Sequence, residues 1–248
     1  MAESFKPIAV RPPNENRIFF FVRCCFDLQM LTIFRFLKDE LKNCRGRILD
    51  VGAGEGPWRK MFPDTVTYVG VDVVASDDFG MNKQPGMIYY DGVRLPFADG
   101  SFEHVRLTEV LEHVSTPHNL LRDIHRILTP GGSIILTVPW SARVHHAPFD
   151  YFRFSNFGLK MVLEDSGFSV HVIKARGNDI AVVANKLIVM IMRLLRPGRR
   201  SQLIITLPLV FFFGFFAITF LIAAQITLYK SLGNQEDPLG YGVIAVKG

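Results

Sequence analysis

Downstream of residue 46, short apolar runs alternate with stretches whose apolar residues recur at helical spacing. The short runs predict strands at 47–51, 67–71, 87–90, 102–107, 133–137 and 169–174, and the helical stretches lie at 56–62, 117–128 and 155–166. Strands separated by helices are typical of a parallel sheet that is covered on both faces. Pro130-Gly131-Gly132 predicts a tight turn before the fifth strand. We therefore expect an α/β core over residues 46–178, with a Rossmann-like, doubly wound sheet.

Two helical regions flank this core. Residues 1–16 contain several prolines and predict an irregular lead, whereas residues 17–42 form an amphipathic pattern for one helix or a pair. We expect residues 1–45 to cap the core, although the run Phe19–Phe21 would also suit a helix on a membrane surface. On the other side, residues 180–195 predict an apolar helix that carries Lys186 and Arg193.

A long uncharged stretch follows that helix. Residues 201–229 contain no charged side chain, and most of them are Leu, Ile, Val, Phe or Ala. About 20 apolar residues suffice to cross the hydrocarbon core of a bilayer. A helix buried inside a soluble domain is the alternative, but few domains can bury such a helix on all sides. We expect residues 179–230 to associate with a membrane.

Composition and charge support this division. The chain has 248 residues, 49% of them hydrophobic, with three Cys, and its mean hydropathy is +0.22. These values exclude a disordered chain and a disulfide-stapled scaffold. The formal charge of +5 divides into +1 over residues 1–178 and +4 over residues 179–248. Four arginines precede the apolar stretch: Arg193, Arg196, Arg199 and Arg200.

Arginines beside a membrane segment favour anionic head groups and the cytoplasmic side. The basicity is thus weak evidence for nucleic-acid binding, and we expect no nucleic-acid partner. Residues 1–17 carry charges and no apolar core of a secretory signal. We expect a membrane-associated protein whose catalytic domain is cytoplasmic.

A glycine-rich turn follows the first predicted strand. In the segment from Asp50 to Gly56 the glycines are Gly52, Gly54 and Gly56, with Ala53 between the first two. Glycine permits positive φ and close approach of a ligand. A dinucleotide site needs a glycine three residues after Gly54, where Pro57 stands, and Asp50 and Glu55 would repel a pyrophosphate. The loop favours S-adenosylmethionine, which bears an ammonium and a sulfonium.

Acidic residues also follow the next two strands. Asp72 and Val73 end the second strand, where a carboxylate can accept both ribose hydroxyls. Asp91-Gly92 follows the third strand, at a position suited to the adenine edge. Each aspartate alone could instead cap a helix. Three acids at successive strand ends beside a glycine loop favour a cofactor site.

These motifs together resemble a class I S-adenosylmethionine-dependent methyltransferase of the type 11 kind. The matching stretches are LDVGAGEG at 49–56, YVGVDV at 68–73, YYDGVRLPFADGSFEHV at 89–105, TEVLEHV at 108–114 and RILTPGGSIILTVP at 126–139. The resemblance implies that residues 50–56 hold the methionine part, Asp72 the ribose and Asp91 the adenine. It also implies that the segment from Thr108 to His113 lines the cofactor floor near the methyl group. Glu103 stands where the family usually has Asp.

A second motif suggests the chemistry at the acceptor. His145, Pro148, Asp150 and Arg153 resemble a stretch that some members of the family carry over the methyl-donor site. His145 or His146 could act as a general base, because an imidazole titrates near neutral pH. Alternatively, Asp150 and Arg153 pair to hold the loop and the histidines are polar lining. Adjacent histidines on a loop are weak evidence for a metal, and we predict no metal site.

In the resembled family the sheet ends with an antiparallel seventh strand, and residues 239–247 suit that strand. A single membrane crossing by residues 201–229 would place this strand on the far side, away from the sheet. We therefore favour a hairpin that enters and returns, with a break at Pro208 or Gly214 between residues 203–213 and 215–228. A single span, with residues 239–248 outside the sheet, is the alternative.

The sequence thus predicts a membrane-associated methyltransferase that uses S-adenosylmethionine. Membrane attachment favours a lipid, an isoprenoid quinone or a lipid-linked glycan as the methyl acceptor. The alternatives are an NAD-dependent oxidoreductase and a non-catalytic membrane adaptor that keeps a cofactor-binding fold.

Overall fold

The computed structural model describes residue 13, residues 16–196 and residues 200–248, and its centre is a mixed sheet of seven strands. The strand order is β3-β2-β1-β4-β5-β7-β6. The strands are β1 (Gly46–Val51), β2 (Val66–Val73), β3 (Ile88–Tyr90), β4 (Phe102–Thr108), β5 (Leu128–Pro139), β6 (Phe168–Arg176) and β7 (Gly240–Lys247). Only β7 is antiparallel to its neighbours β5 and β6. The predicted fold class is confirmed.

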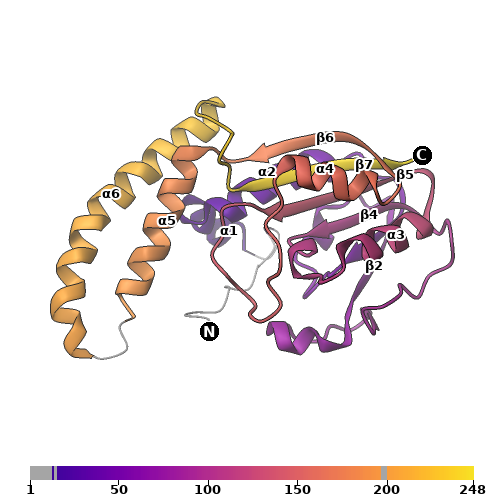
Figure 1. The fold of residues 1–248 in the computed structure, drawn as a ribbon, viewed down its shortest axis with the longest axis horizontal. Helices are drawn as coiled ribbons and strands as arrows, with labels where there is room; N and C mark the ends of the chain where they lie inside the picture. Colours follow the sequence, from indigo (N-terminus) through magenta and orange to yellow (C-terminus); the bar gives the residue numbers. More distant parts are fainter. Residues whose placement is uncertain (1–12, 14–15, 197–199) are drawn as a thin grey trace.

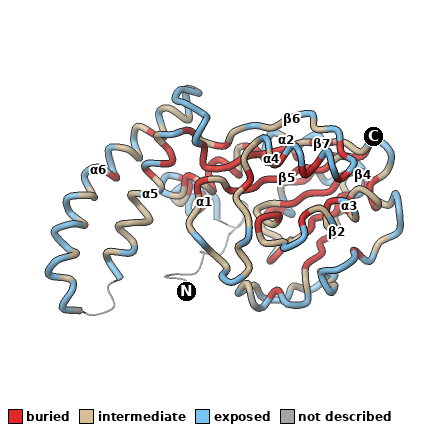
Figure 2. Tube along the Cα trace, in the orientation of Figure 1, coloured by how far each residue is buried: buried red, intermediate tan, exposed pale blue. Residues whose placement is uncertain are grey.

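Apolar side chains alternate between the two faces of the sheet and form two cores. One core joins β1, β4 and β5 to α3 (Pro117–Ile127) and α4 (Asn156–Glu164). The other joins the opposite face to α1 (Arg17–Phe26), α2 (Leu28–Leu41) and α5 (Asp179–Leu194). In β1, Leu49 lies in the first core and Ile48 in the second, as the strand period of two requires. Figure 2 shows the buried positions concentrated in and around this sheet.

The N-terminal helical pattern is a pair of helices, because Asp27 interrupts it. The Asp27 side chain accepts a hydrogen bond from the Met30 amide at the start of α2, and it forms an ion pair with Arg23 in the last turn of α1. An aspartate at this position satisfies amide groups that the helix start leaves free.

Two local predictions were wrong. The helix expected at residues 56–62 is only a 3₁₀ turn, Arg59–Met61, because Gly56 is left-handed (φ 69°) and prolines flank the segment at 57 and 63. The tight turn expected at 130–132 is an irregularity inside β5, where the pairing with β4 shifts register and Gly131 takes a φ of 73°. The remaining strands and helices agree with the prediction to within a few residues.

The apolar stretch forms one uninterrupted helix, α6 (Leu203–Lys230). The expected break at Pro208 or Gly214 is therefore absent. Pro208 lies close to the helix start, so it removes one hydrogen bond, and long helical segments on either side of Gly214 offset the glycine's lower propensity.

The helical hairpin exists nevertheless, but its two legs are α5 and α6. Both project away from the sheet and lie side by side (Figure 1). Their shared base is fixed by Asn178, whose side chain donates to Thr227 Oγ1 at 3.0 Å and to the Leu232 carbonyl at 2.7 Å. Because β7 pairs within the sheet, a single crossing that separates residues 239–248 from it does not fit this fold. Of the four arginines noted above, Arg199 lies outside the described residues.

Candidate active site

The glycine loop lies at the carboxyl ends of the parallel strands. Gly52, Gly54 and Gly56 all have positive φ, at 66°, 55° and 69°. A Cβ built on Gly52 would lie 2.5 Å from Val110 Cγ2, and one on Gly54 would lie 2.6 Å from Met81 Sδ. The left-handed backbone therefore favours glycine at both positions, and the Val110 side chain also leaves little room for a Cβ at Gly52. Ala53 is buried between them. This is the crevice that open α/β sheets use for nucleotide-like ligands.

Asp50 is buried on the face opposite Leu49, where it meets a buried arginine. Its Oδ2 accepts hydrogen bonds from Arg106 and from the Tyr68 hydroxyl. Asp50 and Arg106 are each 1% exposed. Oδ1 of Asp50 has no hydrogen-bond partner among the described residues, so it has capacity for a donor such as an ammonium.

Asp72 lies directly beneath the loop. Its Oδ2 accepts from the Gly54 amide and its Oδ1 from the Val73 amide, both at 2.7 Å. Burial raises the pKa of Asp72 despite these two amide donors. The contacts tie the end of β2 to the loop, and each carboxylate oxygen keeps acceptor capacity for a ribose hydroxyl.

Three further predicted cofactor residues lie along the same edge. Asp91 Oδ1 accepts from the Val93 amide at 2.9 Å, which forms a tight turn around Gly92 (φ 81°). Asp91 and Gly92 are exposed. Thr108 ends β4, and its hydroxyl accepts from Arg106 at 3.2 Å. The structure thus brings the predicted loop and its acids to one edge of the sheet.

Beyond β4, His113 and the predicted acceptor loop meet in a cluster of imidazoles. The His113 and His145 ring centroids are 4.7 Å apart, and His146 lies 5.2 Å from His113. His113 Nδ1 lies 2.9 Å from the Phe149 carbonyl oxygen, so this nitrogen carries the proton and donates. Burial and the nearby His145 lower the pKa of His113 to about 4, so its ring is neutral at physiological pH. The backbone of His146 is left-handed, with a φ of 52°.

Asp150 holds this loop in place. Burial opposes ionisation of Asp150, but two hydrogen bonds from Arg153, at 2.6 and 2.8 Å, and one from the His145 amide lower its pKa to about 2. Such a carboxylate is a poor base at neutral pH. The contacts match the alternative in which Asp150 and Arg153 fix the loop, while His145 and His146 remain the predicted candidates for a base.

Four side chains at the site were not singled out from the sequence. Glu112 lies fully buried beside His113 and His145. Glu109 forms an ion pair with the buried Arg176, with 2.7 Å between Oε1 and Nη2. Phe79, from the segment after β2, packs on His113, His146 and Phe149. The acids belong to the recognised stretch TEVLEHV, which was a usable signal. Phe79 and Arg176 reach the site only through the tertiary fold.

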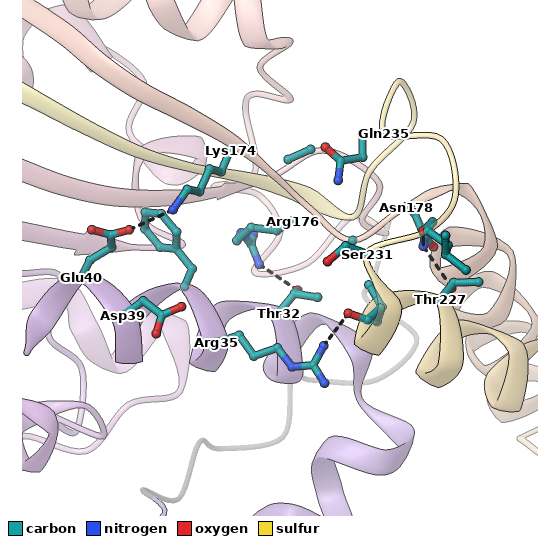
Figure 3. Close-up of a pocket in the computed structure, with 15 residues that line it drawn as sticks. Thr32, Arg35, Asp39, Glu40, Lys174, Arg176, Asn178, Thr227, Ser231 and Gln235 are labelled. Atoms are coloured by element: carbon teal, nitrogen blue, oxygen red, sulfur yellow. Dashed lines mark hydrogen bonds and ion pairs between the residues drawn. The ribbon is translucent and has the colours of Figure 1, made fainter.

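A separate hollow lies behind Arg176, at the base of the hairpin (Figure 3). It holds about 210 Å³ and is lined by α2, the end of β6 and the end of α6. Ligand pockets usually measure about 300–1,000 Å³. None of the predicted cofactor residues lines this hollow, so it is distinct from the candidate active site.

Residues 28–171 match the methyltransferase domain family, and since this is more than half of the chain, the protein belongs to that family. Similar curated proteins include a demethylmenaquinone methyltransferase of Renibacterium salmoninarum, 33% identical over 115 residues, or 43% of this chain and 45% of that protein. A methyltransferase of Mycobacterium tuberculosis is 35% identical over 96 residues, covering 36% of this chain and 38% of that protein. The chain thus spans less than half the length of these relatives.

Solved structures agree on the fold. An S-adenosylmethionine-dependent methyltransferase of Mesorhizobium loti has a TM-score of 0.54 at 14% identity, with 89% of this chain and all of that chain covered. The [4+2]-cyclase SpnF has a TM-score of 0.54 at 19% identity, with 88% and 82% covered. A cyclase on the same fold shows that fold alone does not assign the reaction.

The family match makes this chain a methyltransferase-domain protein, and that family implies S-adenosylmethionine rather than a nicotinamide as the cofactor, so the NAD-dependent oxidoreductase is set aside. The residues present fit the cofactor. Three left-handed glycines form the loop at the carboxyl edge of the sheet, and a buried Asp50 oxygen lacks a hydrogen-bond partner among the described residues. When bound, S-adenosylmethionine supplies an electrophilic methyl group, while the protein aligns the acceptor and excludes water.

Proposed function

We propose that this enzyme methylates a quinone that is dissolved in the membrane, and that the α5–α6 hairpin holds the catalytic domain at the cytoplasmic membrane surface. The observation that carries the proposal is the place where the hairpin leaves the sheet. Pro139, Gly240 and Arg176 lie side by side in the sheet register, at the carboxyl ends of β5 and β6. The hairpin therefore begins and ends on the edge that also bears the glycine loop.

The surface of the hairpin supports contact with lipid. Among the described residues, α6 alone is long and apolar enough to cross a membrane; its most apolar window has a mean hydropathy of 2.5 and is 6% buried. Phe211, Phe212 and Phe215 are 60–78% exposed. A soluble protein rarely exposes so continuous an apolar surface.

Helix α1 extends this apolar surface. Gln225 of α6 donates to the Cys24 and Cys25 carbonyl oxygens, which ties the two helices together. Several apolar side chains of α1 are exposed: Ile18, Phe19, Phe21, Val22 and Phe26. Helix α1 lies next to the base of the hairpin (Figure 1), and we propose that α6 and α1 together form the membrane-facing surface.

The charged positions of the hairpin favour a shallow insertion. Lys186 and Arg193 are exposed on α5, and Arg196 follows that helix. Arginines near the hairpin tip are most stable among head groups, so we propose that α6 lies toward the acyl chains and α5 toward the head groups. Full crossing by both legs would carry the arginines through the hydrocarbon core.

Two observations favour a quinone over the other acceptors. Relatives in the comparison are named demethylmenaquinone methyltransferases. The site also presents flat rings: Phe79 lies 5.2 Å from Phe149 and 5.6 Å from His146, between ring centroids. Aromatic side chains suit a flat, apolar acceptor ring. The reacting species would be the reduced quinol, because a quinone has no hydroxyl group and is not a nucleophile. His145 or His146 would take the proton that the quinol loses when it accepts the methyl group.

The acceptor is tested with the full-length protein, methyl-labelled S-adenosylmethionine and membranes from cells that lack the protein. We expect label in the quinone fraction of the lipid extract, and none with Asp72→Ala, which removes the ribose acceptor. Label in phospholipid or in lipid-linked glycan, with an unlabelled quinone fraction, would refute the quinone assignment.

Membrane contact is tested separately by co-sedimentation with anionic phospholipid vesicles. Full burial of a Phe contributes roughly 1.5–3 kcal/mol, so replacing Phe211, Phe212 and Phe215 by Ser should lower binding at least about tenfold. Phe157→Ser is the matched control, since Phe157 on α4 is 79% exposed but belongs to the catalytic domain. Equal binding of both variants would refute the surface.

A further inference from the structure

We propose that Glu112, His113 and His145 form a site for a divalent first-row transition metal ion such as Zn²⁺ or Co²⁺. Each residue offers one ligand atom, and these three atoms lie within 4.8 Å of one another. The inference goes beyond the methyl transfer and does not depend on the identity of the acceptor.

The first argument is the state of Glu112. Its side chain is completely buried, and neither carboxyl oxygen has a hydrogen-bond partner among the described residues. A buried carboxylate without partners is costly, and the cost is relieved by protonation, by an ion pair or by a metal ion. The only described groups facing Oε1 at ion-pair distance are the two imidazoles, His113 Nε2 at 3.7 Å and His145 Nε2 at 3.9 Å.

The second argument is the tautomer of each imidazole. His113 Nδ1 donates to the Phe149 carbonyl oxygen. His145 Nδ1 lies 3.1 Å from the Arg143 carbonyl oxygen and 3.4 Å from Asp150 Oδ2, so it also carries its proton. Both Nε2 atoms therefore keep their lone pairs and face Glu112. Metal-binding histidines are oriented in this way, by a carbonyl or a carboxylate on the other nitrogen.

The third argument is geometric. Two ligands of one metal ion can be no farther apart than about 4.2 Å, twice a metal–ligand bond of about 2.1 Å. The Glu112 Oε1 distances to both Nε2 atoms are already below this limit, and the three atoms lie within 4.8 Å of one another, so an ion could draw them together with a shift of less than about 1 Å. Backbone hydrogen bonds also hold the Glu112 segment against the loop that carries His145. The Glu112 carbonyl oxygen accepts hydrogen bonds from the Tyr151 and Phe152 amides, at 2.9 and 3.2 Å.

Two imidazoles and one carboxylate suit Zn²⁺, Co²⁺ or Fe²⁺ better than Mg²⁺ or Ca²⁺. Three protein ligands leave at least one coordination position open, as in catalytic rather than structural zinc sites. In the proposed reaction, an oxygen of the acceptor would fill that position, and His146, not the metal-bound His145, would then take the acceptor's proton. This last step rests on the proposed function, whereas metal binding itself does not.

The test uses the full-length protein in detergent after removal of metals with a chelator. Titration with Co²⁺ is followed by the visible absorption of the bound ion, and titration with Zn²⁺ by calorimetry. We expect one equivalent of each metal to bind. Glu112→Gln and His145→Ala should each lower the metal affinity more than about 100-fold, because mutation of residues that only hydrogen-bond to metal ligands already lowers it about 10–100-fold.

His146→Asn is the matched control. Its ring lies 5.4 Å from that of His145, it is not one of the three ligands, and Asn tolerates the left-handed backbone at this position. Binding of S-adenosylmethionine, measured in parallel, establishes that each variant is folded. The proposal is overturned if the wild type binds no Co²⁺ or Zn²⁺, if His145→Ala binds them as the wild type does, or if His146→Asn abolishes binding.

Discussion

The buried ion pair between Arg106 of β4 and Asp50 of β1 gives a quantitative test of the core beneath the cofactor loop. We consider Arg106→Met, which keeps the length of the side chain but removes its charge. Asp50 would then retain only the hydrogen bond from Tyr68, at 2.7 Å, while remaining 1% exposed. The carboxylate would be a buried charge without a cation.

Removing one partner of a buried pair costs about 3–5 kcal/mol. In a chain of this size each kcal/mol moves the melting temperature by about 2–4 °C, so we expect Arg106→Met to lower it by roughly 6–20 °C. Replacing both partners by apolar side chains is often neutral. The double variant Asp50→Leu, Arg106→Met should therefore recover most of the loss.

The assay is thermal unfolding of the full-length protein in detergent without S-adenosylmethionine, so that cofactor binding does not contribute. Tyr68→Phe serves as a control that removes one neutral donor, at a cost of about 1 kcal/mol. A drop of less than about 2 °C for Arg106→Met, or a double variant no more stable than the single one, would refute the reasoning.

Three further predictions concern the cofactor acid, the last strand and the hairpin base. Burial raises the pKa of Asp72, and binding of the ribose hydroxyls needs the ionised carboxylate. Calorimetry should therefore show that cofactor affinity falls on acidification, at a pH above the ordinary range of aspartate pKa values. The same pH profile for Asp72→Asn would contradict this expectation. In Gly240→Ala, the new Cβ would collide with the Arg176 side chain and the Val138 carbonyl oxygen, so we expect β7 to detach and limited proteolysis to cut near residue 240. In the control Gly131→Ala, the new Cβ has no neighbouring atom within contact distance, and β7 should stay in the sheet. Asn178→Ala removes the N-cap of α5 and the hydrogen bonds to Thr227 and Leu232, and we expect it to lower the free energy of unfolding by about 2–3 kcal/mol in chemical denaturation. A loss below about 1 kcal/mol would show that other contacts hold the base of the hairpin.

The strands and the glycine loop could be predicted from the sequence because their signals are local. An apolar run such as residues 47–51, followed by glycines at fixed spacing, specifies a strand end and a turn without knowledge of distant residues. The antiparallel last strand was also predictable, although only through the family resemblance. Its exact partners, β5 and β6, depend on where the long helices place its start.

The hairpin was mislocated because only one of its legs has a distinctive composition. Residues 203–229 are predominantly apolar and carry no charge, whereas α5 carries Asp179, Lys186 and Arg193 and resembles an ordinary amphipathic helix. Proline and glycine in the apolar stretch suggested a bend, but neither is sufficient to interrupt a helix of 28 residues. Pairing of α5 with α6 is a tertiary property that periodicity does not report.

The cluster around Glu112 illustrates the same limit at the site. His113 and Glu112 were visible in one short motif, and His145 in another more than thirty residues later. Their approach depends on the loop after β5 folding back over β4, held by Asp150, Arg153 and the Glu112 carbonyl oxygen. Sequence spacing gives no information on that approach.

The position of β7 has a consequence for biosynthesis. This strand lies between β5 and β6, yet it is the last to leave the ribosome, after both hairpin helices have been made. Until then β6 has no strand partner and one side of β5 is open. The sheet is therefore completed only after α5 and α6 have emerged. If these helices bind the membrane as proposed, completion of the sheet and delivery to the bilayer would become a single ordered event.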